Sequence, residues 1–149
     1  MSKFFKLLLI IFFLKSCSYE PIHLNKNFNF QFTEISFEGE KNINEIIKRK
    51  LLSSTSGEIK YDLFFKSKKI KEIIKSDTKG DPKIFRIIVN VNYKVFKNGE
   101  QILQNESVKQ STYNSINDKY ELTQYENNIL RSLSDNISSE ILFSIKVLN

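Results

Sequence analysis

The sequence predicts a single α+β domain with the element order strand, helix, strand, strand, strand, helix. Four segments alternate apolar and polar side chains, as half-buried strands do. The dipeptide Asn98-Gly99 separates the last two of these segments, and the apolar period becomes helical after Asn117. Together these observations favour a mixed sheet packed against helices.

The first strand is predicted over residues 28–37. Its alternation changes parity between Phe32 and Ile35, which indicates a bulge or a slip in the middle of the strand. Gly39 then ends the strand.

A short amphipathic helix is predicted next, up to about Ser54. Asn42 and Glu45 have the spacing of a capping box at its start. A short turn separates this helix from a second alternating segment, residues 59–65. A strand, a helix and a strand in so few residues predict that the two strands pair in parallel.

The segment 67–83 leaves two alternatives open. Ile70, Ile73 and Ile74 fit either an extension of the preceding strand or a helical turn, and residues 77–82 contain the loop formers Asp, Gly and Pro. The longest alternation follows over residues 85–95. Asn98-Gly99 predicts a two-residue hairpin turn, which makes residues 102–113 the partner strand.

The last element is predicted as a helix of roughly 28 residues, because apolar side chains recur at helical spacing from Leu122 to Leu148. Asn117 or Asp118 is the expected N-cap. The polar face is expected to carry Asn127, Asn128, Ser134, Asp135, Asn136, Ser138 and Ser139. Such a face predicts a packed helix without a site of its own.

The N-terminal segment resembles a bacterial lipoprotein signal. Lys3 and Lys6 precede an apolar run over residues 7–14, which is too short for the roughly 20 residues of a spanning helix. The run ends in Leu14-Lys15-Ser16-Cys17, which resembles a lipobox with an unusual Lys15. Acylation of Cys17 is therefore predicted; a secretory signal with a stray cysteine and an uncleaved anchor are the alternatives.

The predicted organisation has three parts: a signal peptide at 1–16, a lipidated tether at 17–27 and one domain at 28–149. Acyl chains on Cys17 would anchor the protein without a spanning helix. By resemblance to lipoprotein sorting, Ser18 favours the outer membrane, since an aspartate in that position is the usual signal for the inner one. We therefore expect an outer-membrane location with the domain facing the periplasm.

Composition argues against an enzyme and against a nucleic-acid partner. The formal net charge of +6 includes the signal lysines Lys3, Lys6 and Lys15, and their removal leaves only +3. Cys17 is the lone cysteine, and the lone histidine, His23, lies in the tether, where it is not positioned as a base. The four glycines all fall at expected turns. No cofactor and no metal are therefore expected.

Five stretches along the chain resemble one family. Residues 17–23 read Cys-Ser-Tyr-Glu-Pro-Ile-His, close to an opening Cys-Gly-Phe-x-Pro-Leu-Tyr, with departures at Ser18, Tyr19, Ile22 and His23. The other stretches are 61–63, 85–89 with the Asn98-Gly99 turn, 111–114 and the final helix. In these motifs and their order the sequence resembles the LptE family of lipopolysaccharide-assembly lipoproteins.

The resemblance implies a fold and a role. The fold is a two-layer α+β sandwich in which two helices pack on one face of a four-stranded mixed sheet. The role is that of a plug inside the β-barrel LptD, with which the lipoprotein moves lipopolysaccharide to the cell surface and whose assembly it supports. Alternation places Arg86, Asn90, Asn92 and Lys94 on one sheet face, which would be the wet face that a polar barrel lumen needs.

A cationic stretch is the candidate lipopolysaccharide site. Its members face only Glu72 within ten residues, and they are Lys66, Lys68, Lys69, Lys71 and Lys75. Ammonium groups can pair with lipid phosphates as point charges. Solvated surface lysines are the alternative reading. For the whole protein, the alternatives are a lipid-binding carrier whose layers part around an acyl chain, and a structural or pilot lipoprotein of another complex.

Overall fold

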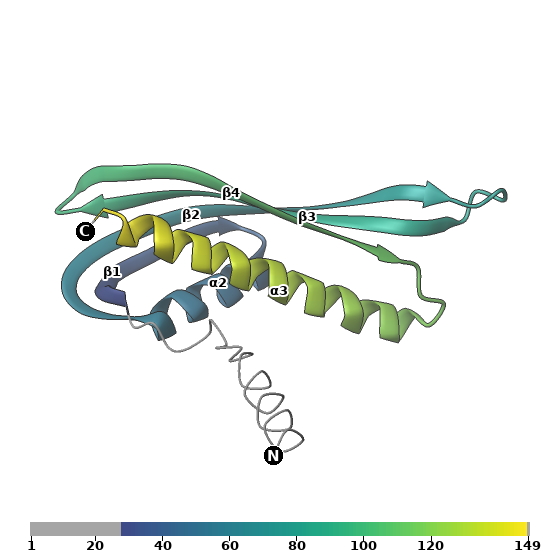
Figure 1. The fold of residues 1–149 in the computed structure, drawn as a ribbon, viewed down its shortest axis with the longest axis horizontal. Helices are drawn as coiled ribbons and strands as arrows, with labels where there is room; N and C mark the ends of the chain where they lie inside the picture. Colours follow the sequence, from purple (N-terminus) through teal and green to yellow (C-terminus); the bar gives the residue numbers. More distant parts are fainter. Residues whose placement is uncertain (1–27, 149) are drawn as a thin grey trace, which may run out of the picture.

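Two helices cover one face of a four-stranded sheet (Figure 1) in the computed structural model, which describes residues 28–148. The elements are β1 (Phe28–Gly39), α2 (Lys41–Ser54), β2 (Thr55–Ser76), β3 (Pro82–Lys97), β4 (Glu100–Asn114) and α3 (Lys119–Lys146). Their order and layering confirm the predicted α+β sandwich. Within residues 28–148, no helix is long and apolar enough to cross a membrane.

The sheet is mixed, with the strand order β1-β2-β3-β4. β1 pairs with β2 in parallel, as predicted, and the two later pairs are antiparallel. The predicted irregularity in β1 is confirmed by a register shift between Phe32 and Glu34. Asn98 and Gly99 both adopt positive φ, at 53° and 82°, as the predicted two-residue hairpin turn requires.

The segment 67–83 extends the second strand. β2 continues to Ser76, and the Asp77 carboxylate closes the turn by accepting from the backbone N–H groups of Lys79 and Asp81. β1 ends opposite Ser67, so β2 and β3 run on together beyond it. We call this part, residues 68–90, the distal hairpin; its tip projects past the rest of the molecule (Figure 1).

The predicted capping box of α2 is wrong. The helix begins at Lys41 with Glu40 as N-cap, and no side chain caps it, so Asn42 and Glu45 already lie inside the helix. Ser67 on β2 takes part in fixing this helix start instead, since its Oγ accepts from the backbone N–H of Glu40 at 3.0 Å. A contact between residues far apart in sequence has replaced the local motif.

Asn44 adds further hydrogen bonds to the contact between Ser67 and Glu40, and we call this meeting point of β1, α2 and β2 the joint. Its side chain is buried, accepts from the Ser67 hydroxyl at 2.6 Å and donates to the Glu38 carbonyl at 3.2 Å. A buried polar group is tolerated when its hydrogen bonds are made within the protein. The joint therefore fixes where β1 turns into α2.

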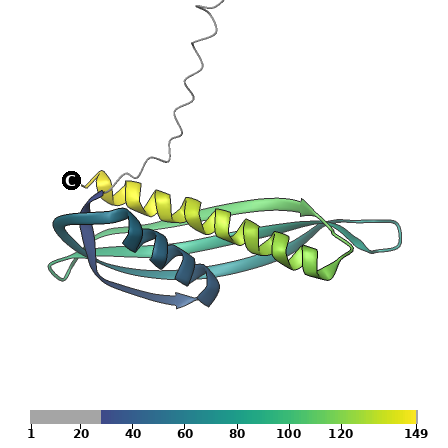
Figure 2. The same cartoon turned by 90° about the horizontal axis from the view of Figure 1, so that it is seen from below.

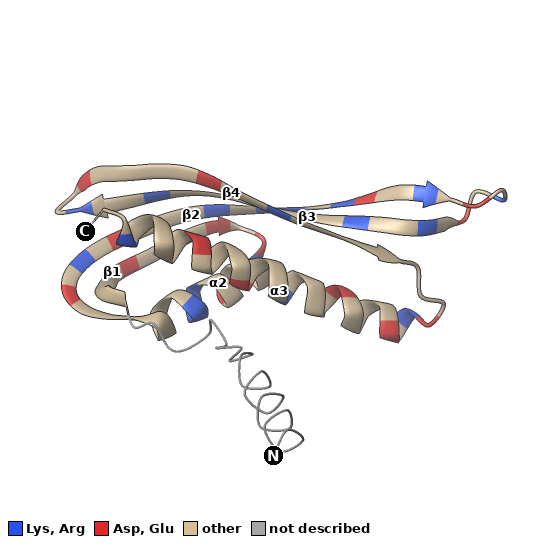
Figure 3. Cartoon of the chain, in the orientation of Figure 1, with Lys and Arg blue, Asp and Glu red and all other residues tan. Residues whose placement is uncertain are grey.

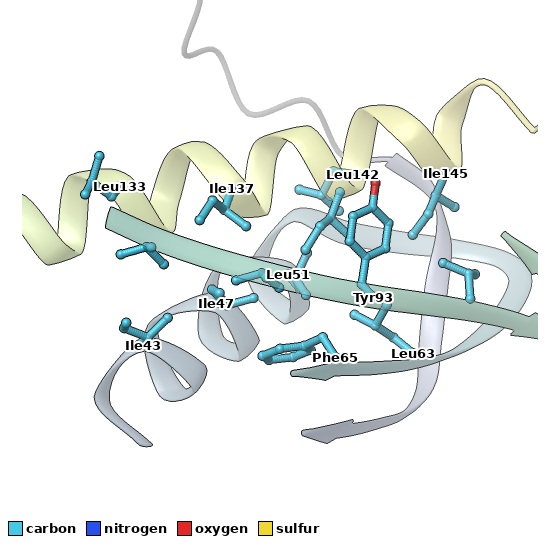
Figure 4. Close-up of a cluster of buried hydrophobic side chains, with 14 of the residues drawn as sticks. Ile43, Ile47, Leu51, Leu63, Phe65, Tyr93, Leu133, Ile137, Leu142 and Ile145 are labelled. Atoms are coloured by element: carbon cyan, nitrogen blue, oxygen red, sulfur yellow. The ribbon is translucent and has the colours of Figure 1, made fainter. Parts of the chain in front are cut away.

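The core lies between the two layers (Figure 4). Its fully buried side chains come from both helices and from β1, β2 and β3, and they include Phe30, Ile43, Ile47, Leu51, Leu63, Phe65, Val89, Val91, Val95, Ile137, Ile141 and Ile145. Strand alternation supplies the sheet side of this core, and the helical period supplies the other. This is the core that the apolar patterns predict.

The predicted polar face of α3 is wrong at two positions. Ser134 and Ser138 are fully buried. Their hydroxyls donate to carbonyls one turn earlier, those of Leu130 and Ser134, at 2.7 and 2.8 Å. A serine that satisfies its hydroxyl on its own helix can face the core, and its small size lets a neighbouring element approach closely.

The molecule has two unlike ends. At one end β1 begins, both helices finish and β3 turns into β4 (Figures 1 and 2). We call this the entry end, because the chain enters the described fold there at Phe28. At the opposite end lie the tip of the distal hairpin and the start of α3. The candidate lysines belong to the strand that runs from one end to the other.

Candidate functional site

The predicted lipidation site, Cys17, lies outside the described residues, as do the signal 1–16 and the tether 17–27. Acylation of Cys17 therefore stays a prediction. The structure places the other five candidates, the lysines of β2, on two different faces of the sheet.

Alternation along β2 separates the lysines. Lys66 and Lys68 lie opposite Asn92 and Asn90, on the sheet face that no helix covers, which we call the open face. Lys69 and Lys71 lie opposite Val89 and Ile87, which face the helices. Lys75 is paired with Ile84 after an irregularity in the strand. A cluster in sequence is therefore not one patch in space; Figure 3 shows its members spread along β2.

The five lysines also differ in their partners. Lys66 pairs with Glu38 at 3.0 Å in an exposed ion pair, and Lys71 pairs with Glu126 at 2.6 Å. No carboxylate among residues 28–148 lies within 4 Å of the other three ammonium groups, those of Lys68, Lys69 and Lys75. These three are the lysines best able to meet an external phosphate.

Glu126 on α3 joins the helix to the distal hairpin. Its Oε1 accepts from Lys71 Nζ and from the Tyr113 hydroxyl. Burial alone would raise the pKa of Glu126, but the hydrogen bonds from Lys71 and Tyr113 outweigh it and hold the pKa below its usual value. Burial, and then the bond to Glu126, raise the pKa of Tyr113.

Aromatic rings complete this joint. The rings of Phe85 and Tyr113 stack with centroids 5.5 Å apart, and Lys71 Nζ lies 4.6 Å from the centre of the Phe85 ring. A cation over a ring and a charge-assisted hydrogen bond hold Lys71 in one place. Lys71 therefore binds α3 to the sheet, and its charge is already used within the protein.

A second polar joint lies nearer the entry end. Glu140 on α3 accepts from Lys109 at 2.5 Å and from the Ser107 hydroxyl at 2.8 Å, both on β4. The bond from Lys109 is the main cause of the lowered pKa of Glu140. Tyr93 on β3 reaches the same helix through a 3.0 Å hydrogen bond to Ser144. Polar contacts thus fasten α3 to the sheet along its length.

The open face is polar at its centre, and its alternation confirms the predicted wet face. Asn92 donates to Asn90 at 3.1 Å, and Asn90 donates to Glu106. Arg86 lies 3.8 Å from Glu72 across the strand pair. Apolar side chains flank these groups, namely Ile70 opposite Ile88 and the half-exposed Val108. The face offers hydrogen-bonding groups and charges of both signs.

Sequence reasoning missed the two interlayer carboxylates. Glu126 lies four, seven and eleven residues before Leu130, Leu133 and Ile137, and so on the apolar stripe of α3. A carboxylate on an apolar stripe needs a partner, because burying an unpaired charge is costly. The position of Glu126 on the apolar stripe was therefore the sequence feature that could have predicted an ion pair between the layers. Which lysine would serve as its partner depended on the register of β2 and β3, which the pattern did not give.

Within the described part of the chain, no three His, Cys, Asp or Glu side chains gather as a metal site. The described fold contains polar contacts between the helices and the sheet, together with a polar open face. It can offer hydrogen bonds and ammonium groups to a partner or a ligand.

Solved structures of lipoproteins share this fold. Rare lipoprotein B from Shewanella oneidensis matches 77% of this chain and 95% of its own, with a TM-score of 0.59 at 10% identity. The uncharacterized lipoprotein B from Nitrosomonas europaea matches 87% and 92%, with a TM-score of 0.58 at 11% identity. A minor lipoprotein from Acinetobacter baumannii matches 76% and 92%, with a TM-score of 0.52 at 14% identity. No family model and no curated protein matches the sequence.

Proposed function

We propose that this chain is an outer-membrane lipoprotein anchored by acyl chains on Cys17, with its domain facing the periplasm. One observation carries the proposal: a domain with the fold of solved lipoproteins follows closely behind a lipobox cysteine. The lipobox and the fold are independent properties of the chain. The protein acts by binding, without a chemical step.

The finer proposal is a plug for an LptD-type β-barrel in lipopolysaccharide transport. It is supported by the resemblance of the opening residues 17–23 and the later motifs to the LptE family. It is further supported by the open face, because a plug needs polar groups toward the polar lumen of an outer-membrane barrel. Asn90, Asn92 and Glu106 supply such groups.

Lipopolysaccharide phosphates are the proposed ligands of the distal hairpin. The original five candidates divide by their partners, since Lys66 and Lys71 are paired with Glu38 and Glu126. Lys68 and Lys75 lie opposite Asn90 and Ile84, at positions of the open face. We therefore assign first contact with phosphate to these two lysines, and a secondary role to Lys69 on the helix side.

The joints between the layers argue against a carrier. A carrier would have to separate α3 from the sheet to admit an acyl chain. The ion pairs from Lys71 and Lys109, the bond from Tyr93 to Ser144 and the interlocked core all oppose that separation. A pilot or structural lipoprotein of another complex stays the alternative, and the identity of the partner decides between them.

The test is to solubilise outer membranes gently, purify the full-length protein and identify its stoichiometric companions by mass spectrometry. The mass of the Cys17 peptide is read in the same experiment. Acylated Cys17 together with one large β-barrel supports both levels of the proposal. Acylated Cys17 with another assembly supports the lipoprotein and contradicts the plug, whereas an unmodified Cys17 contradicts the lipoprotein.

A further inference from the structure

The entry end of the helical layer exposes apolar side chains. Val147, just after α3, is 86% exposed. Leu148 follows it at 44%, and Leu52 in the last turn of α2 is 49% exposed. Single exposed apolar residues are common, but several at one end of a domain mark a contact surface.

The chain enters the fold at the same place. The ring of Phe28, the first residue of β1, packs edge-on against the ring of Phe143 on α3, with centroids 5.7 Å apart. The C-terminal turns of α2 and α3 both lie at this end of the molecule (Figures 1 and 2). The point where the tether joins the domain is therefore next to the exposed apolar residues.

The tether is short compared with the molecule. Residues 17–27 reach at most roughly 40 Å even at about 3.5 Å per residue. β2, with 22 residues, spans roughly 70 Å at about 3.3 Å per residue. Acyl chains on Cys17 therefore hold the entry end within roughly 40 Å of the bilayer.

Basic side chains accompany the apolar ones. Arg49 and Lys50 are exposed in the last turns of α2, and Lys146 is exposed in the last turn of α3 (Figure 3). Glu58 and Glu100 lie on strands in the other layer, and Glu140 on α3 is paired with Lys109. Exposed apolar groups beside basic ones are typical of surfaces that bind anionic lipid.

We propose that this end of the helical layer is a membrane-contact surface. Leu52, Val147 and Leu148 enter the headgroup region of the leaflet that holds the acyl chains. Arg49, Lys50 and Lys146 pair with lipid phosphates. The inference rests on the proposed function, because acylated Cys17 brings this end to the bilayer. It adds an orientation, in which the entry end faces the leaflet that holds the acyl chains.

The test uses a spin label at either end of α3. Cys17 is the only cysteine and acylation consumes its thiol, so Val147→Cys creates a single reactive site. Tyr120→Cys is the matched control, an exposed residue (74%) at the opposite end of the same helix. The full-length lipidated proteins are reconstituted in vesicles of phosphatidylethanolamine and phosphatidylglycerol. Collision of each nitroxide with oxygen, which is lipid-soluble, is compared with collision with a water-soluble nickel chelate.

The proposal predicts that the ratio of oxygen to nickel collisions is several-fold higher at position 147 than at position 120. A label at 147 that meets nickel as freely as the label at 120 overturns the proposal. A label at 147 that is shielded from both agents also overturns it, because protein rather than lipid then covers this surface.

Flotation of the vesicles and the mass of the Cys17 peptide report separately on the anchor. A protein that floats with the vesicles while its label at 147 meets water contradicts only the membrane-contact surface. A protein without acyl chains that stays behind contradicts the lipoprotein proposal and the inference that rests on it.

Discussion

Lys68 and Lys69 are neighbours in the chain and lie on opposite faces of the sheet. Neither forms an ion pair within 4 Å among residues 28–148, although the charge of Lys69 also helps to lower the pKa of Glu126. They form a pair of probes for the proposed contact with lipopolysaccharide. At this scale, strand alternation decides which charges can act together.

Lys68→Glu is expected to weaken lipopolysaccharide binding about tenfold or more, since a hydrogen bond to a charged group contributes about 1.5–3 kcal/mol. Lys69→Glu on the helix side is expected to have a smaller effect. Lys60→Glu, on the same strand nearer the entry end, is the control. Binding of labelled lipopolysaccharide to the purified variants measures all three. Equal affinity in wild type and Lys68→Glu would remove the open face from the site.

Glu126 makes the stability of the fold depend on pH. Its pKa in the folded protein lies below the ordinary value of 4.5, because Lys71 and Tyr113 stabilise the carboxylate. The stabilisation is thus complete above pH 4.5 and is lost as the pH falls through the folded-state pKa. Glu126→Gln is expected to lower the free energy of unfolding by about 1–2 kcal/mol at pH 7, and by less at pH 3.

Urea unfolding at both pH values measures this difference. Glu34→Gln, an exposed glutamate on β1, is the control and should change little. A cost of Glu126→Gln that is the same at pH 3 and pH 7 would show that the carboxylate charge does not hold the layers together.

The turn from β1 into α2 depends on a glycine. Gly39 has φ +99°, and a Cβ placed there would lie 2.0 Å from the carbonyl oxygen of Ser67 on β2. Gly39→Ala is expected to cost about 3 kcal/mol or more, because backbone must move. Gly80→Ala is the control: its φ is +90° but nothing lies within 4 Å, so only the conformational cost of about 1–2 kcal/mol applies. Equal melting temperatures for the two variants would contradict this account of the joint.

The start of α3 is fixed by one side chain. Asp118 accepts from the backbone N–H groups of Tyr120 and Glu121 at 2.8 and 2.9 Å. Asp118→Ala is expected to cost about 1 kcal/mol. Asn117→Ala, which removes the other N-cap that the sequence allows, is expected to cost less than about 0.5 kcal/mol. Thermal unfolding followed by circular dichroism compares the two variants. A larger loss of stability in Asn117→Ala would contradict Asp118 as the N-cap.

Elements whose signals are local could be predicted from the sequence. The alternation of 85–95, the Asn98-Gly99 turn and the long apolar stripe of α3 each predict a structure without knowledge of the rest. The start of α2 could not be predicted, because Ser67, on a later strand, helps to fix it. For a related reason, the sequence did not show that the five candidate lysines lie on two faces of the sheet. That division follows from the continuation of β2 through residues 67–76, a segment for which the sequence allowed either a strand or a helical turn.

The whole molecule is organised along one long axis. The entry end carries the start of β1 and the ends of both helices, and the distal hairpin projects at the other end (Figure 1). A lipid anchor ahead of Phe28 would tether the molecule to the membrane by its entry end. A plug must also meet its barrel on more than one side, so both layers should touch the same partner.

Site-specific photo-crosslinking in living cells tests the plug most directly. A photoreactive amino acid replaces Asn92 on the open face in one strain, and Arg131 on the exposed side of α3 in another. If a barrel surrounds the protein, both positions will form adducts with the same large outer-membrane β-barrel. Adducts from one face only, or adducts with a protein that is not a β-barrel, would contradict the plug.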